Sequence, residues 1–119
     1  MDDDLLDART GHHRRHDGRD PWSLMTRAEA LVRRDLGEHV PSLPPEAPGP
    51  IAVGGYVLLL LVRERADLQG RYEALWAEVT GQDDLVIEAL LDHQPTWIRG
   101  LASGDAIRFE GRHVLRFRG

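Results

Sequence analysis

Hydrophobic and polar residues follow strand-like patterns over the C-terminal half of the chain. The run from Tyr56 to Val62 is apolar at nearly every position, which is typical of a strand buried on both faces. Apolar residues at every second position further along the chain predict four more strands, each with one buried face. The side chains expected on those faces are Leu75, Ala77 and Val79; Leu85, Ile87, Ala89 and Leu91; Ile107 and Phe109; and Leu115 and Phe117.

Turn residues separate these five strands. Residues 81–84 (GQDD) and the pair Glu110-Gly111 predict tight turns, and residues 92–104 form a longer connection. Five short strands joined in this way predict a small, mostly antiparallel barrel or strongly bent sheet. With the helix described next, the fold class is α+β.

One helix is expected before the strands. Asp20 could cap its N-terminus with Pro21 at the first helical position, and Gly37 suits the position just after its end. Thr26 with Glu29 forms a competing capping box, so a later start is also open. Residues at helical spacing predict one buried stripe. They are Leu24, Ala28, Leu31, Val32 and Leu36.

The segments around this helix have distinct compositions. Residues 1–19 mix acidic and basic side chains without apolar periodicity, which predicts a mobile tail. Residues 41–50 (PSLPPEAPGP) are too rich in proline for a helix or a central strand. An extended proline-rich segment of this length spans roughly 30 Å, enough to strap the helix across a small domain. The predicted organisation is a tail over 1–19, a helix and strap over 20–50, and a β-rich domain over 51–119.

Composition narrows the class of protein. The chain has 119 residues, 41% hydrophobic and 29% charged, which is ordinary for one globular domain. Its net charge of −5 disfavours nucleic acid as a partner, and the absence of cysteine removes thiolate chemistry. The acidic start at Asp2 is unlike a secretory signal, and the apolar run Ile51–Val62 is too short to span a bilayer. We therefore expect a cytoplasmic protein with no membrane contact.

From about residue 51 to 117 the chain resembles a bacterial domain of unknown function, the YegJ-like family. The segments that carry this resemblance are 53–57 (VGGYV), 73–79 (EALWAEV), 90–95 (LLDHQP), 100–109 (GLASGDAIRF) and 113–115 (HVL). Residues 92–95 depart from the family pattern, which has an asparagine shortly before the proline. The resemblance implies a fold but no reaction. By analogy with related small domains, it also implies an immunity-like or partner-binding role.

Five residues of these segments are expected to support the fold. Gly104 and Asp105 predict a tight turn, in which the aspartate accepts hydrogen bonds from nearby backbone N–H groups. Trp76 is expected to stabilise the body, with Glu73 ordering its surroundings. Pro95 lies in the long connection.

A basic stripe is predicted on the last strand. Arg112, Arg116 and Arg118 share parity with Val114, so on a regular strand all four would face one side. Arg108 would lie across a C-terminal hairpin from them. Such a stripe could contact an acidic protein, an anion or single-stranded nucleic acid, and it could equally be a solvated face that protects an edge strand.

The leading hypothesis is a non-enzymatic module that binds a protein partner. Its predicted surface combines Arg108, Arg112 and Arg116 with Trp97 and Arg99 on the adjacent loop, where Trp97 would be the aromatic anchor. The sequence predicts no catalytic residue, no cofactor and no metal for this function. A homo-oligomer through the last strand stays open.

Two alternatives belong to other classes. A metal-assisted hydrolase would use His93, His113 and Asp105, because imidazole and carboxylate groups suit zinc or iron. A small-barrel nucleic-acid binder would show exposed aromatic side chains on its basic face. The hydrolase requires the three side chains to converge in the fold.

Overall fold

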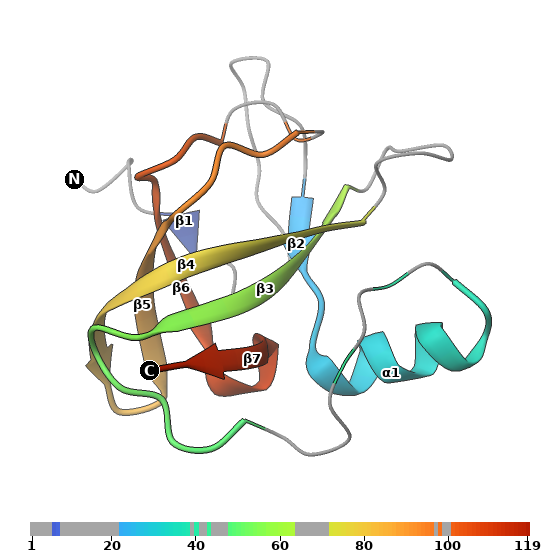
Figure 1. The fold of residues 1–119 in the computed structure, drawn as a ribbon, viewed down its shortest axis with the longest axis horizontal. Coiled ribbons are helices and arrows are strands. Elements are labelled where there is room, and N and C mark those ends of the chain that lie inside the picture. The colour runs from blue at the N-terminus through green and yellow to red at the C-terminus, as the bar shows by residue number, and fades with distance from the viewer. Residues whose placement is uncertain are drawn as a thin grey trace.

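The computed structural model describes residues 6–7, 22–38, 40, 43, 48–63, 72–96, 98 and 101–119. Within these residues the chain forms one helix, seven strands and a single 3₁₀ turn (Figure 1). In chain order the elements are β1 (Leu6–Asp7), β2 (Trp22–Leu24), α1 (Arg27–Asp35), β3 (Tyr56–Arg63), β4 (Tyr72–Asp83), β5 (Val86–Leu91), β6 (Ala106–Glu110), the 3₁₀ turn η1 (Gly111–His113) and β7 (Val114–Arg118). None of the helices in the described part is long and apolar enough to cross a membrane.

The sheet is a mostly antiparallel, strongly curled half-barrel built on β3. Strands β3 to β6 are neighbours in chain order, and β7 returns to pair with β3. The same edge of β3 holds two strands end to end: β7 along residues 56–59 and β2 along residues 61–63. This arrangement confirms the predicted α+β class and the five predicted strands, which are β3 to β7.

Both faces of β3 are buried, as its continuous apolar sequence predicts. Val57, Leu59 and Leu61 point into the curled sheet, whereas Leu58 and Leu60 belong to a second cluster on its outer face. The inner core gathers the buried side chains of every main strand. Its members include Leu75, Ala77, Val79, Ile87, Ala89, Leu91, Ile107, Phe109 and Val114.

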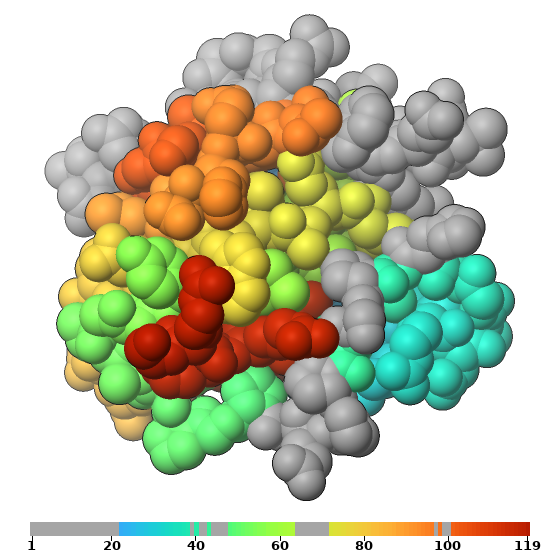
Figure 2. Space-filling model, viewed as in Figure 1, coloured from blue at the N-terminus to red at the C-terminus, as the bar shows by residue number. Residues whose placement is uncertain are grey.

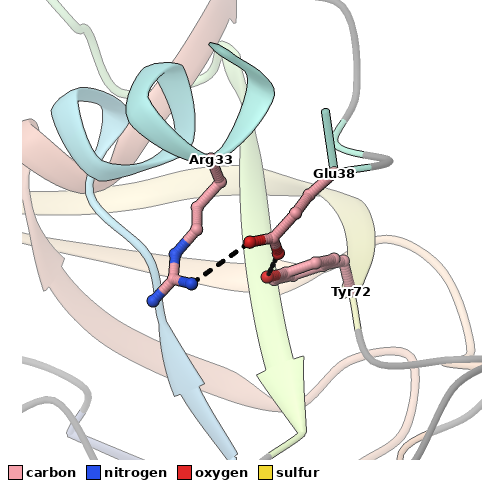
Figure 3. A network of polar contacts seen from close by, with 3 residues as sticks. All are labelled: Arg33, Glu38 and Tyr72. Carbon is pink, nitrogen blue, oxygen red and sulfur yellow. Dashed lines mark hydrogen bonds and ion pairs between the residues drawn. The ribbon is translucent and has the colours of Figure 1, made fainter. Parts of the chain in front are cut away.

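The helix α1 covers part of the outer cluster, where Ala30 is fully buried and Leu31 packs against the cluster. A polar network fastens the end of the helix to the sheet (Figure 3). Arg33 donates to Glu38 at 3.2 Å, and the Tyr72 hydroxyl donates to the other oxygen of the same carboxylate. The hydrogen bond to Glu38 and its negative charge raise the pKa of Arg33.

The helix begins later than the first predicted start, at Asp20. Thr26 is the N-cap and its side chain accepts a hydrogen bond from the Glu29 backbone, so the later start is correct and the start at Asp20 is wrong. Residues 22–24 are instead a strand, because they pair with the C-terminal half of β3. The predicted apolar stripe is also wrong, since Val32 and Leu36 are exposed. Gly37 ends the helix as predicted, with a φ of 87°.

The last two strands do not form the predicted hairpin. β6 pairs with β5 and β1, whereas β7 pairs with β3, because η1 redirects the chain across the end of the half-barrel. A bulge at Leu115 then reverses the parity of β7. Val114 and Phe117 therefore face the inner core, whereas Leu115 joins the outer cluster.

Three smaller predictions have mixed outcomes. The β4–β5 turn is tighter than expected, at Asp84-Leu85, so Leu85 is exposed and Gly81 lies within β4 beside a bulge. Residues 6–7 of the predicted tail form β1, which pairs in parallel with β6. The rest of the tail, and most of the proline strap at residues 41–42 and 44–47, lie outside the described residues.

Candidate interaction surface

On the outer face of the sheet, two rows of side chains run across strands β7, β3 and β4. The two rows are adjacent, two residues apart along each strand. In the first row Arg118 lies opposite Tyr56, which lies opposite Glu78 on β4. Directly opposed residues of antiparallel strands share a face, so these side chains are neighbours. The row ends at the molecular surface, where Arg118 and Glu78 are both exposed.

In the second row Arg116 lies opposite Leu58, which lies opposite Trp76. Leu58 is buried and Trp76 is half-buried, so the row is apolar at its centre and basic at its β7 end. Beyond it, the outer cluster continues beneath α1. Figure 2 shows the C-terminal strand at the surface of the molecule, against residues of β3 and β4.

Arg118 stacks on both aromatic rings of this face. Its guanidinium carbon lies 4.6 Å from the centre of the Trp76 ring and 5.4 Å from that of Tyr56. A guanidinium held over an aromatic face still presents its N–H groups at the edge, where they can donate to a carboxylate. The stack therefore holds a cation in place on an exposed, partly apolar surface. We call Tyr56, Trp76, Arg116 and Arg118 the aromatic–arginine face.

The predicted basic stripe is not one continuous surface. Arg108 lies on β6, where its Nε donates to Glu88 on β5 at 3.1 Å. Arg112 lies on η1 and donates to Glu110 at 2.8 Å. Each of these two arginines is therefore matched by an acidic neighbour, and neither is on β7. Of the four arginines of the predicted stripe, Arg116 and Arg118 belong to the aromatic–arginine face.

Trp97 and Arg99 lie outside the described residues, so their predicted roles stay predictions. Described residues before and after them form hydrogen bonds. The Thr96 backbone N–H donates to Glu73 on β4 at 2.5 Å, and the Gln94 side chain donates to the Leu101 carbonyl at 2.9 Å.

The five residues expected to support the fold occupy structural positions. Glu73 holds the loop at Thr96, and Pro95 is buried. Asp105 accepts a hydrogen bond from the Ala102 backbone at 2.9 Å, and Gly104 adopts a φ of 93° in the same turn. The predicted turn is confirmed. Trp76, in contrast, contributes to the surface as well as to the body, because Arg118 stacks on it.

The residues of the hydrolase hypothesis do not converge. Asp105 precedes β6 and His113 follows it, so the length of a five-residue strand, roughly 16 Å, separates them. His93 is exposed and lies 3.7 Å from Asp92. In the described part of the chain, no three histidine, aspartate or glutamate side chains form a group that could hold a metal ion.

His113 is buried, and it accepts a hydrogen bond from the Glu110 backbone N–H through Nδ1 at 3.1 Å. Burial lowers the pKa of His113, and the positive charge of Arg112 lowers it further. The neutral ring therefore helps to hold the turn between β6 and β7. This is a structural role.

Comparison with known proteins gives no relative. No family model matches the chain, and no curated protein and no solved structure matches it either. The resemblance to the YegJ-like family therefore stays a prediction.

Proposed function

We propose that this domain is a non-enzymatic protein-interaction module that binds its partner through the aromatic–arginine face. The observation that carries the proposal is the stacking of Arg118 on Trp76 and Tyr56 at the surface. Tryptophan, tyrosine and arginine are the side chains most enriched among residues that dominate binding energy at protein interfaces. Here all three meet on adjacent strands of the sheet.

Local charge favours a partner with an acidic surface. The chain carries a net charge of −5, yet its C-terminal strand exposes Arg116 and Arg118. A local patch of the opposite sign to the whole molecule directs an acidic partner to one place and orients it there. An immunity-like role, which the YegJ-like resemblance implies, would be one instance of such binding.

Single-stranded nucleic acid is less well supported as the ligand. Base stacking requires exposed aromatic rings, and Arg118 already lies over both rings of this face. A base could stack on Trp76 only after displacing the guanidinium. The negative net charge adds a further penalty for a phosphate backbone.

The proposal is tested by capturing partners with the full chain from the lysate of its native cells. Arg118→Glu should abolish the near-stoichiometric capture of one protein. Arg34→Glu, a matched charge reversal on the exposed face of α1, should retain it. Both variants should keep the circular dichroism and melting temperature of the parent.

Loss of the captured protein with both variants, or with neither, contradicts this surface assignment. Salt-dependent binding of an oligonucleotide by the parent chain, without any protein partner, would favour the nucleic-acid alternative instead.

A further inference from the structure

A cavity of about 640 Å³ lies beside the start of α1. Its walls come from the first turns of α1, from the segment 48–51 that precedes β3, and from η1 with the first residue of β7. Figure 1 shows α1 beside η1, and these two elements contact one another. We call this space the α1–η1 cavity. Its volume falls within the range of about 300–1,000 Å³ that is usual for sites that hold small molecules.

The α1–η1 cavity lies where the two hydrophobic clusters meet. Ile51 and Val114 belong with the inner core, whereas Leu31 packs against the outer cluster, and all three side chains line the cavity. The helix therefore meets the end of the half-barrel without filling the space between the clusters. Protein interiors are normally close-packed, so the apolar walls of this space lack contacts that such side chains usually make. An apolar molecule of suitable size would supply them.

Two glycines in the lining give independent evidence of open space. A Cβ atom added to Gly49 or to Gly111 would meet no other atom of the described residues within 4 Å. Neither glycine has a φ in the left-handed region, so the backbone does not require glycine at these positions. On the wall formed by α1, Ala28 is also small. Small side chains on separate segments thus keep the cavity open.

The polar side chains of the lining are already engaged. The Thr26 hydroxyl caps α1, and Arg112 donates to Glu110 at 2.8 Å, so its charge is matched by a carboxylate. Arg27 also has an interaction elsewhere in the chain. The other lining residues are apolar side chains or glycine. Because the arginine charges are used within the protein, the lining favours an uncharged ligand over an anion.

The shape of the site favours a small molecule over a second protein. A stable protein interface buries roughly 1,000 Å² or more of broad surface, whereas this space is a hollow between three short segments. Concave, mostly apolar spaces with few polar groups are typical of sites for small organic ligands. Transfer of apolar surface from water into such a space is favourable without any charge pairing.

We propose that the α1–η1 cavity binds an uncharged, predominantly apolar small molecule. The ligand contacts Leu31, Ile51 and Val114 and so joins α1 to the end of the half-barrel. The site shares no residue with the aromatic–arginine face, and the inference goes beyond the proposed function without depending on it.

The test uses the full chain and prodan, an uncharged naphthyl ketone whose fluorescence shifts to shorter wavelength in apolar surroundings. Titration should show saturable binding of one prodan molecule per chain with this shift. Because no charge pairing is involved, the dissociation constant should change less than about twofold between roughly 0.05 and 0.5 M salt. Prodan should also raise the melting temperature of the parent, since it binds the folded state.

Variants that fill the cavity locate the bound probe. Ala28→Phe and Gly49→Phe add a ring from two different walls, and each should weaken prodan binding at least about tenfold. Val32→Phe is the matched control, because Val32 is on the exposed side of α1 and does not line the cavity. It should change binding less than about twofold, as should Arg118→Glu. Circular dichroism checks the fold of each variant.

Amide NMR spectra of the parent locate the probe without any substitution. Prodan should cause its largest shift changes at Ala28, Gly49 and Gly111. The inference is refuted if prodan does not bind saturably, or if the largest shifts fall outside the cavity walls. Undiminished binding by both filling variants would also refute it. Tighter, strongly salt-dependent binding of the anionic probe anilinonaphthalene sulfonate would contradict an uncharged ligand. The capture experiment decides the proposed function separately.

Discussion

The position of β7 depends on a glycine that lies just before β3. Gly55 is buried, and a Cβ atom added to it would lie 2.5 Å from two carbons of the Phe117 ring and 2.9 Å from the backbone oxygen of Arg118. Ordinary contacts of a Cβ atom begin near 3.4 Å. The Phe117 ring and the β7 backbone would both have to move by several tenths of an ångström or more.

We therefore predict that Gly55→Ala lowers the free energy of unfolding by about 1–3 kcal/mol, the usual cost of overpacking a core. The backbone conformation at Gly55 lies outside the left-handed region, so the loss comes from the collision alone. For a domain of this size, each kcal/mol corresponds to roughly 3–6 °C in the melting temperature. Urea unfolding followed by circular dichroism measures the first quantity, and a thermal scan measures the second.

Gly49→Ala is the matched control, because a Cβ atom there meets nothing within 4 Å. It should change the free energy of unfolding by less than about 0.5 kcal/mol. Adding Phe117→Leu to Gly55→Ala should recover part of the loss, which a double-mutant cycle would measure as a favourable coupling. Equal stability of the Gly55→Ala and Gly49→Ala variants would refute the close packing of Phe117 on Gly55.

Three further predictions concern the helix and the buried histidine. Thr26→Ala should cost about 1 kcal/mol, because it removes the cap on Glu29 N–H; an unchanged urea midpoint would contradict the observed helix start. Tyr72→Phe should cost about 1–2 kcal/mol, because the Glu38 carboxylate loses a donor, and unaltered stability would show that this network does not hold α1 on the sheet. Neutral His113 should contribute its full stability above pH 6.5, the ordinary pKa of histidine. As the pH falls below 6.5 the unfolded chain takes up the proton first, so this stability should be lost as the pH approaches the lowered pKa of the folded state. Unfolding of the parent and of His113→Asn from pH 5 to 8 tests this, and parallel pH profiles would contradict it.

The local sequence pattern was sufficient to predict those strands in which burial follows a regular repeat along the chain. The continuous apolar run of β3 and the alternation of Leu75, Ala77 and Val79 reflect contacts that repeat along a strand, so the sequence predicts both the strands and their buried faces. The Gly104-Asp105 turn was predictable for a similar reason, since its hydrogen bond closes within three residues.

Errors arose where a distant segment determines the local structure. Trp22–Leu24 continues the helical pattern in sequence, yet it pairs with β3 some forty residues later. The hairpin of β6 and β7 was expected because the two are adjacent in sequence, whereas the closing strand of a curled sheet returns to β3. The bulge at Leu115 changes which residues share a face, and nothing in the neighbouring sequence predicts it.

The candidate surface was only partly predictable for the same reason. Arg116 and Arg118 were identified from their alternate positions on the last strand. The partnership of Arg118 with Trp76 and Tyr56 joins three strands, so it depends on the registers of β3 with both β4 and β7. Trp76 was therefore assigned to the body alone. Arg108 and Arg112 were included because their acidic partners, Glu88 and Glu110, could not be inferred from spacing.

The most direct test of the central claim is amide hydrogen exchange of the full chain with and without the partner protein that it captures from the lysate of its native cells. The account predicts slower exchange at residues 115–118 of β7, with smaller changes along β3 and β4 beneath the aromatic–arginine face. Unchanged exchange at β7, together with protection of α1 or of the β5–β6 pair, would contradict the assignment of this surface.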